Sequence, residues 1–310
     1  MLEVSHYTKR YGKTVACNDL SFSLPDGSVT VLLGPNGAGK STLMKGIMGF
    51  LRFEGSILVN GLPNTHRQSR RTLGYIPEMP SFYPNLTVFE HFEFVARAYK
   101  LGNKRVYRAR AEELLERFSL TEHQRKLGSE LSKGMAQKLS ICLGLFTQPS
   151  VLLLDEPFIG LDPHAIKELK HTIGELRREG ATLLVSTHII DSVDMLWDRA
   201  IVLKKGSVVL DVTKESLEQS EESLEQLFFA ATEGTAHDVG AADKRLQGDG
   251  HNSDDEQWTD DARRLSDERR SDTWQHPDDA RRPGDRPRPS TAPRSDTSPR
   301  SRPDDDARTD

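Results

Sequence analysis

The chain has 310 residues, of which 35% are hydrophobic and 29% are charged, and its formal net charge is -5. This length allows one large domain or two small ones, and no apolar run approaches the roughly 18–20 residues that cross a bilayer. Because the N-terminus lacks the apolar core of a signal peptide, we expect a cytoplasmic protein whose association with a membrane depends on a partner.

The charge is unevenly distributed along the chain. Residues 233–310 carry 20 acidic and 14 basic side chains, which leaves 27 acidic and 28 basic side chains in residues 1–232. The nearly neutral body has no electrostatic footprint for nucleic acid, so no nucleic-acid partner is expected. Residues 233–310 are rich in Asp, Arg, Pro and Ser and cannot bury enough apolar surface to offset the entropy of ordering. We predict a domain over residues 1–232 and a disordered tail that is either dispensable or used for docking.

Apolar and polar residues alternate over residues 2–7 and 14–24, which is the pattern of half-buried strands. Tyr11 falls between them, in a predicted loop. Its ring could stack on an adenine base or could simply pack against the domain.

Residues 29–42 read VTVLLGPNGAGKST, an apolar run followed by a glycine-rich turn. The spacing is that of a phosphate-binding loop, in which glycines let several backbone N–H groups point at one anion. The helix that follows adds the partial positive charge of its N-terminus. Lys40 can reach the β- and γ-phosphates and the Ser41 hydroxyl can hold Mg²⁺, so we predict a bound nucleoside triphosphate. The predicted loop residues are Gly34, Pro35, Asn36, Gly37, Ala38, Gly39, Lys40, Ser41 and Thr42.

Two short apolar segments, over residues 55–61 and 73–77, predict further strands. They are followed by Glu78 and then by residues 79–84, which mix large apolar side chains with prolines and show no helical or strand period. Residues 79–84 therefore form either a buried loop or an exposed docking surface.

Helical patterns recur over residues 87–101, 105–118 and 132–146. Because few strand signals interrupt them, they predict a helical subdomain inserted into an α/β core at about residues 85–147. Ser132 and Gly134 stand at the start of the last helix. They are either an ordinary helix cap or a second anion site.

Residues 151–154 are continuously apolar and are followed by Asp155 and Glu156. Such a run indicates a strand buried on both faces of a parallel sheet, and ligands bind at the carboxyl ends of such strands. Beside a phosphate loop, Asp155 can orient the Mg²⁺ shell and Glu156 can polarise a water molecule. The alternative is an acidic strand end that caps the next helix.

His188 follows a second buried strand, predicted over residues 182–186. A single histidine at a strand end is often structural, but this strand should end near the same ligand, which favours a functional role. A helix is predicted between the two strands, from Pro163 to about Glu179. A hairpin over residues 200–211 and a helix near 213–230 then complete the domain.

These motifs, in this order, resemble those of the nucleotide-binding subunit of an ABC transporter, and the resemblance covers roughly residues 2–230. It implies an α/β fold with a P-loop NTPase core, a mixed or parallel sheet, an N-terminal antiparallel β subdomain and an inserted helical subdomain. It also implies an ATPase that uses ATP and Mg²⁺. Two copies of the chain would form a head-to-tail dimer with two ATP molecules between them.

The resemblance also implies roles for individual residues. Tyr11 resembles the aromatic residue that stacks on adenine, and the phosphate loop and Asp155 would hold the triphosphate and its magnesium. Glu156 would be the general base, and His188 the sensor of the γ-phosphate. Asp162 resembles the residue that reaches across the dimer interface.

A second set of residues would act on the ATP held by the opposite subunit. By resemblance these are Ser132 and Gly134, in a signature that reads Leu131-Ser132-Lys133-Gly134-Met135 where the family usually has Leu-Ser-Gly-Gly-Gln. Glu78 stands where the family usually has Gln; its carboxylate can meet Mg²⁺ or water but adds negative charge beside the triphosphate. Both variants look similar to subunits of bacterial exporters for drugs, peptide antibiotics or their immunity systems.

The resemblance therefore implies a motor subunit of an exporter, peripheral on the inner face of the cell membrane through a separate transmembrane permease subunit. A soluble ABC-type ATPase that acts on ribosomes or DNA is the alternative. Such proteins normally carry a second nucleotide-binding domain, a zinc module or a long coiled coil, and this sequence shows none of these features.

Overall fold

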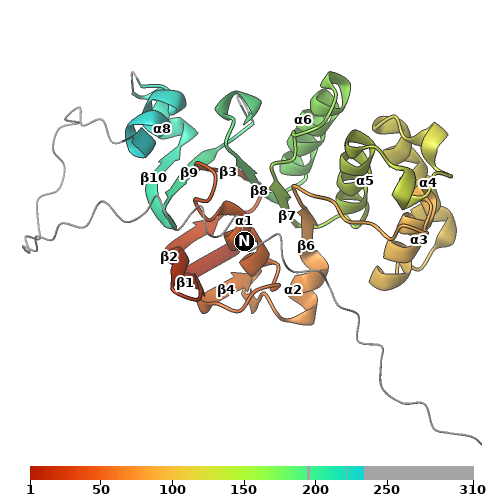
Figure 1. The fold of residues 1–310 in the computed structure, drawn as a ribbon, viewed down its shortest axis with the longest axis horizontal. Coiled ribbons are helices and arrows are strands. Elements are labelled where there is room, and N and C mark those ends of the chain that lie inside the picture. The colour runs from red at the N-terminus through yellow and green to blue at the C-terminus, as the bar shows by residue number, and fades with distance from the viewer. Residues whose placement is uncertain (194–195, 221, 234–310) are drawn as a thin grey trace, which may run out of the picture. The chain divides into compact units, whose positions relative to one another are not determined.

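The computed structural model describes residues 1–193, 196–220 and 222–233. The predicted disordered tail thus lies outside the described residues, apart from Glu233 at the end of the last helix. Two sheets and the helices that cover them make up the described part (Figure 1).

The first sheet is antiparallel and confirms the β subdomain predicted at the N-terminus. Alternating burial along its first two strands turns one face toward the interior. In spatial order its strands are β2 (Thr14–Leu24), β1 (Leu2–Tyr11), β4 (Glu54–Val59) and β5 (Leu62–Pro63).

The second sheet lies at the centre of the domain and is mixed. Its first two strands pair antiparallel as the predicted hairpin, and the other neighbours pair parallel. In spatial order its strands are β10 (Ser207–Thr213), β9 (Arg199–Lys204), β3 (Val29–Leu33), β8 (Thr182–Thr187), β7 (Val151–Asp155) and β6 (Leu73–Ile76).

Eight α-helices lie in the described part of the chain, together with short 3-10 turns at Thr121–His123, Gly128–Glu130 and Ile190–Val193. The α-helices are α1 (Lys40–Ile47), α2 (Arg67–Thr72), α3 (Val88–Tyr99), α4 (Lys104–Arg117), α5 (Lys133–Phe146), α6 (Pro163–Arg178), α7 (Lys214–Glu218) and α8 (Leu224–Glu233).

The central sheet is buried on both faces, as its continuous apolar strands predict. Leu32 and Leu184 face α1 and the antiparallel sheet in one core. Val31 and Val185, one residue away on the same strands, face a second core that includes α5 and α6. Helix α1, which follows the phosphate loop, is therefore held between two sheets.

Helices α3, α4 and α5 all lie between β6 and β7 in the chain, in the stretch of about residues 85–147 for which the sequence predicts a helical subdomain. Phe92 and Phe146 pack edge to face, 5.0 Å apart, inside it. The Thr87 hydroxyl accepts a hydrogen bond from the Glu90 N–H at 3.2 Å, and the Glu90 carboxylate accepts one from the Thr87 N–H at 2.7 Å. This capping box starts α3 at the predicted place.

Two local predictions were wrong, and one short helix was missed. Tyr11 is not in a loop: it ends β1 and pairs with Thr14, because the hairpin turn is shorter than expected. The helix predicted near 213–230 is two helices, α7 and α8, since α7 ends at Glu218. The short helix α2, with its polar sequence Arg67–Thr72, carries no apolar period and was not predicted.

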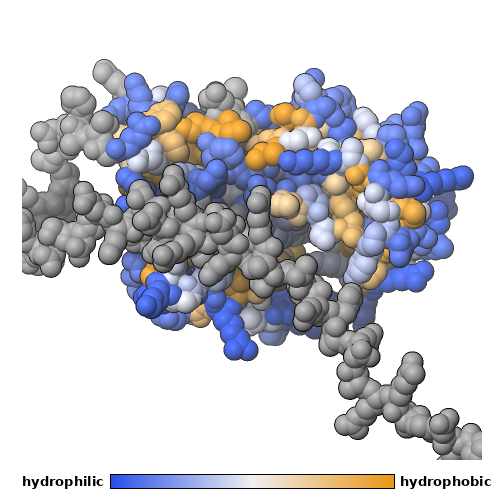
Figure 2. Space-filling view, viewed as in Figure 1, coloured by the Kyte–Doolittle hydropathy of each residue, from blue (hydrophilic) through white to orange (hydrophobic). Residues whose placement is uncertain are grey.

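Residues 79–84, for which a buried loop and an exposed surface were both open, are mainly exposed. Met79 is 82% exposed and Tyr83 is 55% exposed. Phe82 is partly buried against the core. The face of the molecule drawn in Figure 2 is largely hydrophilic, with apolar residues in small separate clusters.

None of the helices in the described residues is long and apolar enough to cross a membrane.

Candidate functional site

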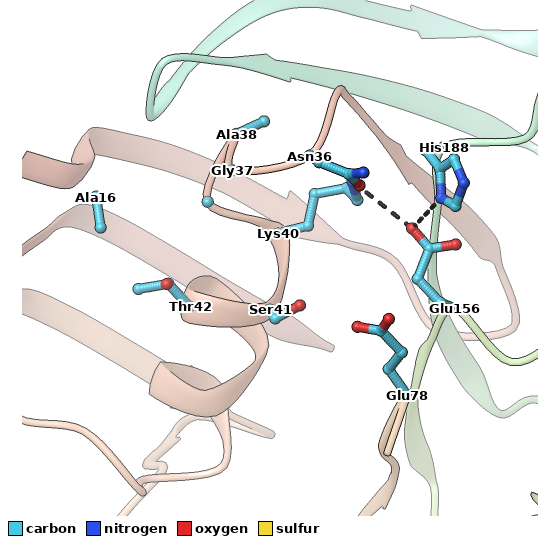
Figure 3. A pocket seen from close by; sticks show the side chains of 11 residues that line it. Ala16, Asn36, Gly37, Ala38, Lys40, Ser41, Thr42, Glu78, Glu156 and His188 are labelled. Atoms are coloured by element: carbon cyan, nitrogen blue, oxygen red, sulfur yellow. Dashed lines mark hydrogen bonds and ion pairs between the residues drawn. The ribbon is translucent and has the colours of Figure 1, made fainter. Parts of the chain in front are cut away.

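A pocket opens where the phosphate loop meets the carboxyl ends of the central strands (Figure 3). Its lining comes from β2, the loop before α1, the first turn of α1, the segment after β6 and the residues that follow β7 and β8. The lining residues are Ala16, Asn36, Gly37, Ala38, Gly39, Lys40, Ser41, Thr42, Glu78, Glu156 and His188.

Two positions of the phosphate loop require glycine because a neighbouring backbone segment lies too close for a side chain. A Cβ on Gly34 would lie 2.4 Å from the carbonyl oxygen of Leu203, and a Cβ on Gly39 would lie 2.6 Å from that of Ala16. Gly39 also has φ +106, a backbone conformation that L side chains rarely adopt. The loop can therefore curl directly into α1, whose first N–H groups have no partners inside the helix.

Lys40 is the cation of this pocket and is only 6% exposed. Its amine donates to the carbonyl oxygens of Gly34 at 2.7 Å and Pro35 at 3.3 Å and lies 3.7 Å from Glu156 Oε1. Burial lowers the pKa of Lys40, and the charges of Glu156, Asp155 and Glu78 oppose that shift.

Two acids stand at the end of β7. Asp155 is 2% exposed and accepts a hydrogen bond on Oδ1 from the Ser41 hydroxyl at 3.2 Å. Glu156, the next residue, has φ +47, and this left-handed turn aims its carboxylate into the pocket. Glu156 Oε1 lies 2.8 Å from Nδ1 of His188. Figure 3 shows the Lys40 amine and the His188 ring both directed at this carboxylate.

The oxygen atoms of this pocket fit a hard divalent cation. The Ser41 hydroxyl touches the Asp155 carboxylate, and Glu78 lines the same pocket. Among the described residues, no group of three or more His, Cys, Asp or Glu side chains could hold a metal by itself. Mg²⁺ commonly binds through one or two carboxylates together with phosphate oxygens, so this donor set suits a cation that arrives with a nucleotide.

Seven predicted site residues do not line the pocket. Gly34, Pro35 and Asp155 nevertheless bond to Lys40 or Ser41, which do line it. The other four are Tyr11, Ser132, Gly134 and Asp162. Tyr11 lies at the end of β1, is 48% exposed and has the Lys9 amine 4.9 Å from its ring centroid. Ser132, Gly134 and Asp162 form a separate group at the starts of α5 and α6.

This separate group is held by helix caps. The Ser132 hydroxyl accepts a hydrogen bond from the Met135 N–H at 3.3 Å, and Asp162 Oδ1 accepts one from the Ala165 N–H at 2.9 Å. Asp162 also pairs with Lys138 at 2.5 Å, and this contact lowers the pKa of the Asp162 carboxyl. A Cβ on Gly134 would lie 3.0 Å from the carbonyl oxygen of Gly160, so the first turn of α5 touches the loop that leads into α6.

Comparison with known proteins decides the family. Residues 17–159 match the ABC transporter family. The lantibiotic transport ATP-binding protein SrtF of Streptococcus pyogenes is 34% identical over 229 residues, which are 74% of this chain and 96% of SrtF. The chain belongs to the ABC transporter ATP-binding family.

Solved structures agree with this assignment. An ATP-binding subunit of an ABC transporter is 34% identical, with a TM-score of 0.70 over 74% of this chain and 99% of that one. A dimeric ATP-binding cassette solved in a post-hydrolysis state with ADP and phosphate is 25% identical, with a TM-score of 0.62 over 69% of this chain and 98% of that one. The predicted α/β fold with a P-loop core is confirmed. The chain is an ATP-binding subunit of an ABC transporter and an ATPase.

Three residues of this ABC subunit's site were missed in the sequence. Ala16 lines the pocket from β2, and Tyr75 and Ser186 bond to Asp155 at 3.2 Å and 2.5 Å. The sequence locates the strands but not their register. The pairing of Asp155 with Ser186 across β7 and β8, and that of Tyr75 with Leu153 across β6 and β7, bring Asp155, Ser186 and Tyr75 to one face of the sheet.

Proposed function

We propose that the phosphate-loop pocket holds ATP with Mg²⁺ and that Glu156 is the base of its hydrolysis. Lys40 would hold the β- and γ-phosphates, because it is buried and its amine already faces the pocket. Ser41, Asp155 and Glu78 would hold the cation, which when bound neutralises charge on the transferred phosphoryl group.

Glu156 is well placed to take a proton from an attacking water molecule. Its carboxylate reaches the pocket and is 6% exposed, and His188 contacts the same oxygen that faces Lys40. Holding Glu156 between a cation and an imidazole fixes its position, and position decides the efficiency of a general base. His188 would donate to the γ-phosphate from the other edge of its ring.

We propose further that two copies of the chain complete each ATP site. The observation that carries this proposal is the separation of the pocket from the group Ser132, Gly134 and Asp162. Ser132 and Gly134, the residues expected to contact a γ-phosphate, could therefore contact a nucleotide bound to a second copy. The dimeric cassette with ADP and phosphate is similar to this chain over most of its length, which supports the same arrangement here.

The dimer would drive a separate membrane permease, and the chain would lie on the inner face of the cell membrane through that subunit. An apolar groove lies between the segment after β6 and helices α3 and α5, with Phe82, Tyr83, Phe94 and Leu143 in its lining. Exposed Met79 belongs to this segment. Large exposed apolar side chains mark interaction sites, so we assign this groove to the permease.

Export is the direction that the similarities favour. SrtF is named a lantibiotic transport ATP-binding protein, and the variant signature and Glu78 resemble those of bacterial exporters for drugs, peptide antibiotics or their immunity systems. The transported substrate would be selected by the permease.

An affinity capture tests the transporter assignment. The Glu156→Gln variant with ATP would be used as bait on detergent-solubilised membranes, with a Lys40→Ala variant as the matched control that cannot hold the nucleotide. Recovery of one multi-spanning protein with Glu156→Gln only is expected. Recovery of ribosomes or DNA-bound proteins with no membrane subunit would favour the soluble ATPase instead.

A further inference from the structure

Three hydroxyl groups converge on the carboxylate of Asp155. Oδ1 accepts hydrogen bonds from Ser41 at 3.2 Å and Ser186 at 2.5 Å, and Oδ2 accepts one from the Tyr75 hydroxyl at 3.2 Å. Asp155 is 2% exposed, so these contacts replace much of the water that a free carboxylate would bind. Of the three donors, only Ser41 belongs to the phosphate loop.

Ser186 connects the two acids of the site. It pairs directly with Asp155 across β7 and β8, which places both side chains on one face. While the Ser186 hydroxyl donates to Asp155, it accepts a hydrogen bond from the Glu156 N–H at 3.2 Å, and the Ser186 carbonyl accepts from the same N–H at 3.1 Å. These bonds hold Glu156 in its left-handed conformation, which a non-glycine residue seldom adopts.

Tyr75 holds the other oxygen of Asp155. It lies on β6 opposite Leu153, two residues before Asp155 and so on the same face of the sheet. Its ring contacts the Phe50 ring edge to face, 6.2 Å between centroids.

Both oxygens need a fixed partner because the last side-chain torsion of aspartate is soft. Without Tyr75 and Ser186, the carboxylate of Asp155 could rotate, so that Oδ2 instead of Oδ1 would face Ser41. Partners of metal ligands commonly act in this way, by orienting the ligand before the metal binds.

We propose that Tyr75 and Ser186 are positioning residues that fix the rotation of the Asp155 carboxylate and so set the cation dependence of nucleotide binding. This inference rests on the proposed Mg²⁺ site. Neither residue touches the nucleotide in this scheme, since neither lines the pocket. Tyr75 therefore acts on the site through Asp155, whereas Ser186 acts both through Asp155 and through the N–H of Glu156.

The test measures ADP affinity by calorimetry while free Mg²⁺ is varied, for the unmodified protein and for Tyr75→Phe and Ser186→Ala. Tyr107→Phe and Ser140→Ala are matched controls, because they remove the same groups from side chains that do not bond to Asp155. We expect the Mg²⁺ concentration for half-maximal tightening to rise about 10- to 100-fold in the two test variants, the usual effect of losing such a partner. ADP affinity in the presence of a chelator should not change.

The outcomes separate this inference from the site on which it rests. If the unmodified protein binds ADP equally well with and without Mg²⁺, the cation site is wrong and the inference falls with it. If the unmodified protein depends on Mg²⁺ and both variants keep its midpoint, only the positioning role is overturned. Tyr75→Phe keeps the ring and its packing, so it carries the test even if Ser186→Ala, at a fully buried position, does not fold.

Discussion

The two groups of residues predicted to act on ATP differ in how one chain assembles them. Lys40, Glu156 and His188 meet in one pocket and are linked by contacts of 3.7 Å and 2.8 Å. Ser132 and Asp162 instead cap their own helices and lie outside that pocket. Folding of one chain thus completes the first group. The second group lies outside the pocket and would not contact a nucleotide bound there by the same chain.

The difference has a topological cause. Parallel strands of one sheet end at the same edge, so residues that follow β3, β7 and β8 converge whatever their separation in sequence. The starts of α5 and α6 are fixed to each other by Gly134 against Gly160 and by Lys138 against Asp162. Each group is therefore held together by contacts within one chain, and changes in the two should have different consequences.

The largest effect is expected for Glu156→Gln in the pocket group. Loss of a positioned general base typically costs about 10²–10⁴-fold in rate, while the amide keeps the shape of the side chain and ATP binding should persist. Steady-state ATPase assays and nucleotide titration check both parts. A variant that hydrolyses ATP at the unmodified rate would show that the base is another group.

Ser132→Ala in the second group should lower turnover by about 10²-fold, the usual cost of one lost transition-state donor. Because Ser132 lies outside the pocket, ATP binding to the single chain should be unchanged. Equal losses of binding and turnover would mean that Ser132 acts through the fold. The helical content of the variant, measured by circular dichroism, controls for loss of the cap on α5.

Thr30→Val should change stability while leaving both groups intact. The Thr30 hydroxyl is the one fully buried side-chain polar atom in the described residues without a hydrogen-bond partner. Replacing an unsatisfied hydroxyl by a methyl group should stabilise the fold by about 1–3 kcal/mol, as measured by urea unfolding. Unchanged or lower stability would contradict the assigned environment of Thr30.

Lys138→Met should have the smallest effect on stability, because Asp162 is 47% exposed. A pair of this kind contributes about 0.2–1 kcal/mol. Lys138 lowers the pKa of folded Asp162, so the contribution is present above the unfolded pKa of about 4 and is lost as the pH falls through the folded value. The free energies of unfolding of the unmodified protein and of Lys138→Met, measured in urea, should differ at neutral pH and become equal in acid. A difference that persists in acid would assign the effect to packing.

Much of this molecule follows from sequence pattern. Apolar runs located β3, β7 and β8, the capping residues located α3, and glycine spacing located the phosphate loop. These signals are local, and each depends on a period or on a backbone conformation that few residues allow.

The remaining features depend on register and on tertiary packing. The bonds of Tyr75 and Ser186 to Asp155 arise because β6, β7 and β8 align with particular residues opposite one another. No single strand encodes that alignment. Tyr11 was placed in a loop because the length of the hairpin turn depends on pairing with Thr14.

Mixing two inactive variants tests most directly whether each ATP site is shared between two copies. Lys40→Ala breaks the pocket group, and Ser132→Arg breaks the second group. A dimer with one chain of each kind keeps one intact pocket facing one intact signature. Mixing the two purified variants should therefore restore ATPase activity well above that of either variant alone. If the mixture shows only the average of the two separate activities, the two groups do not act across copies of this chain.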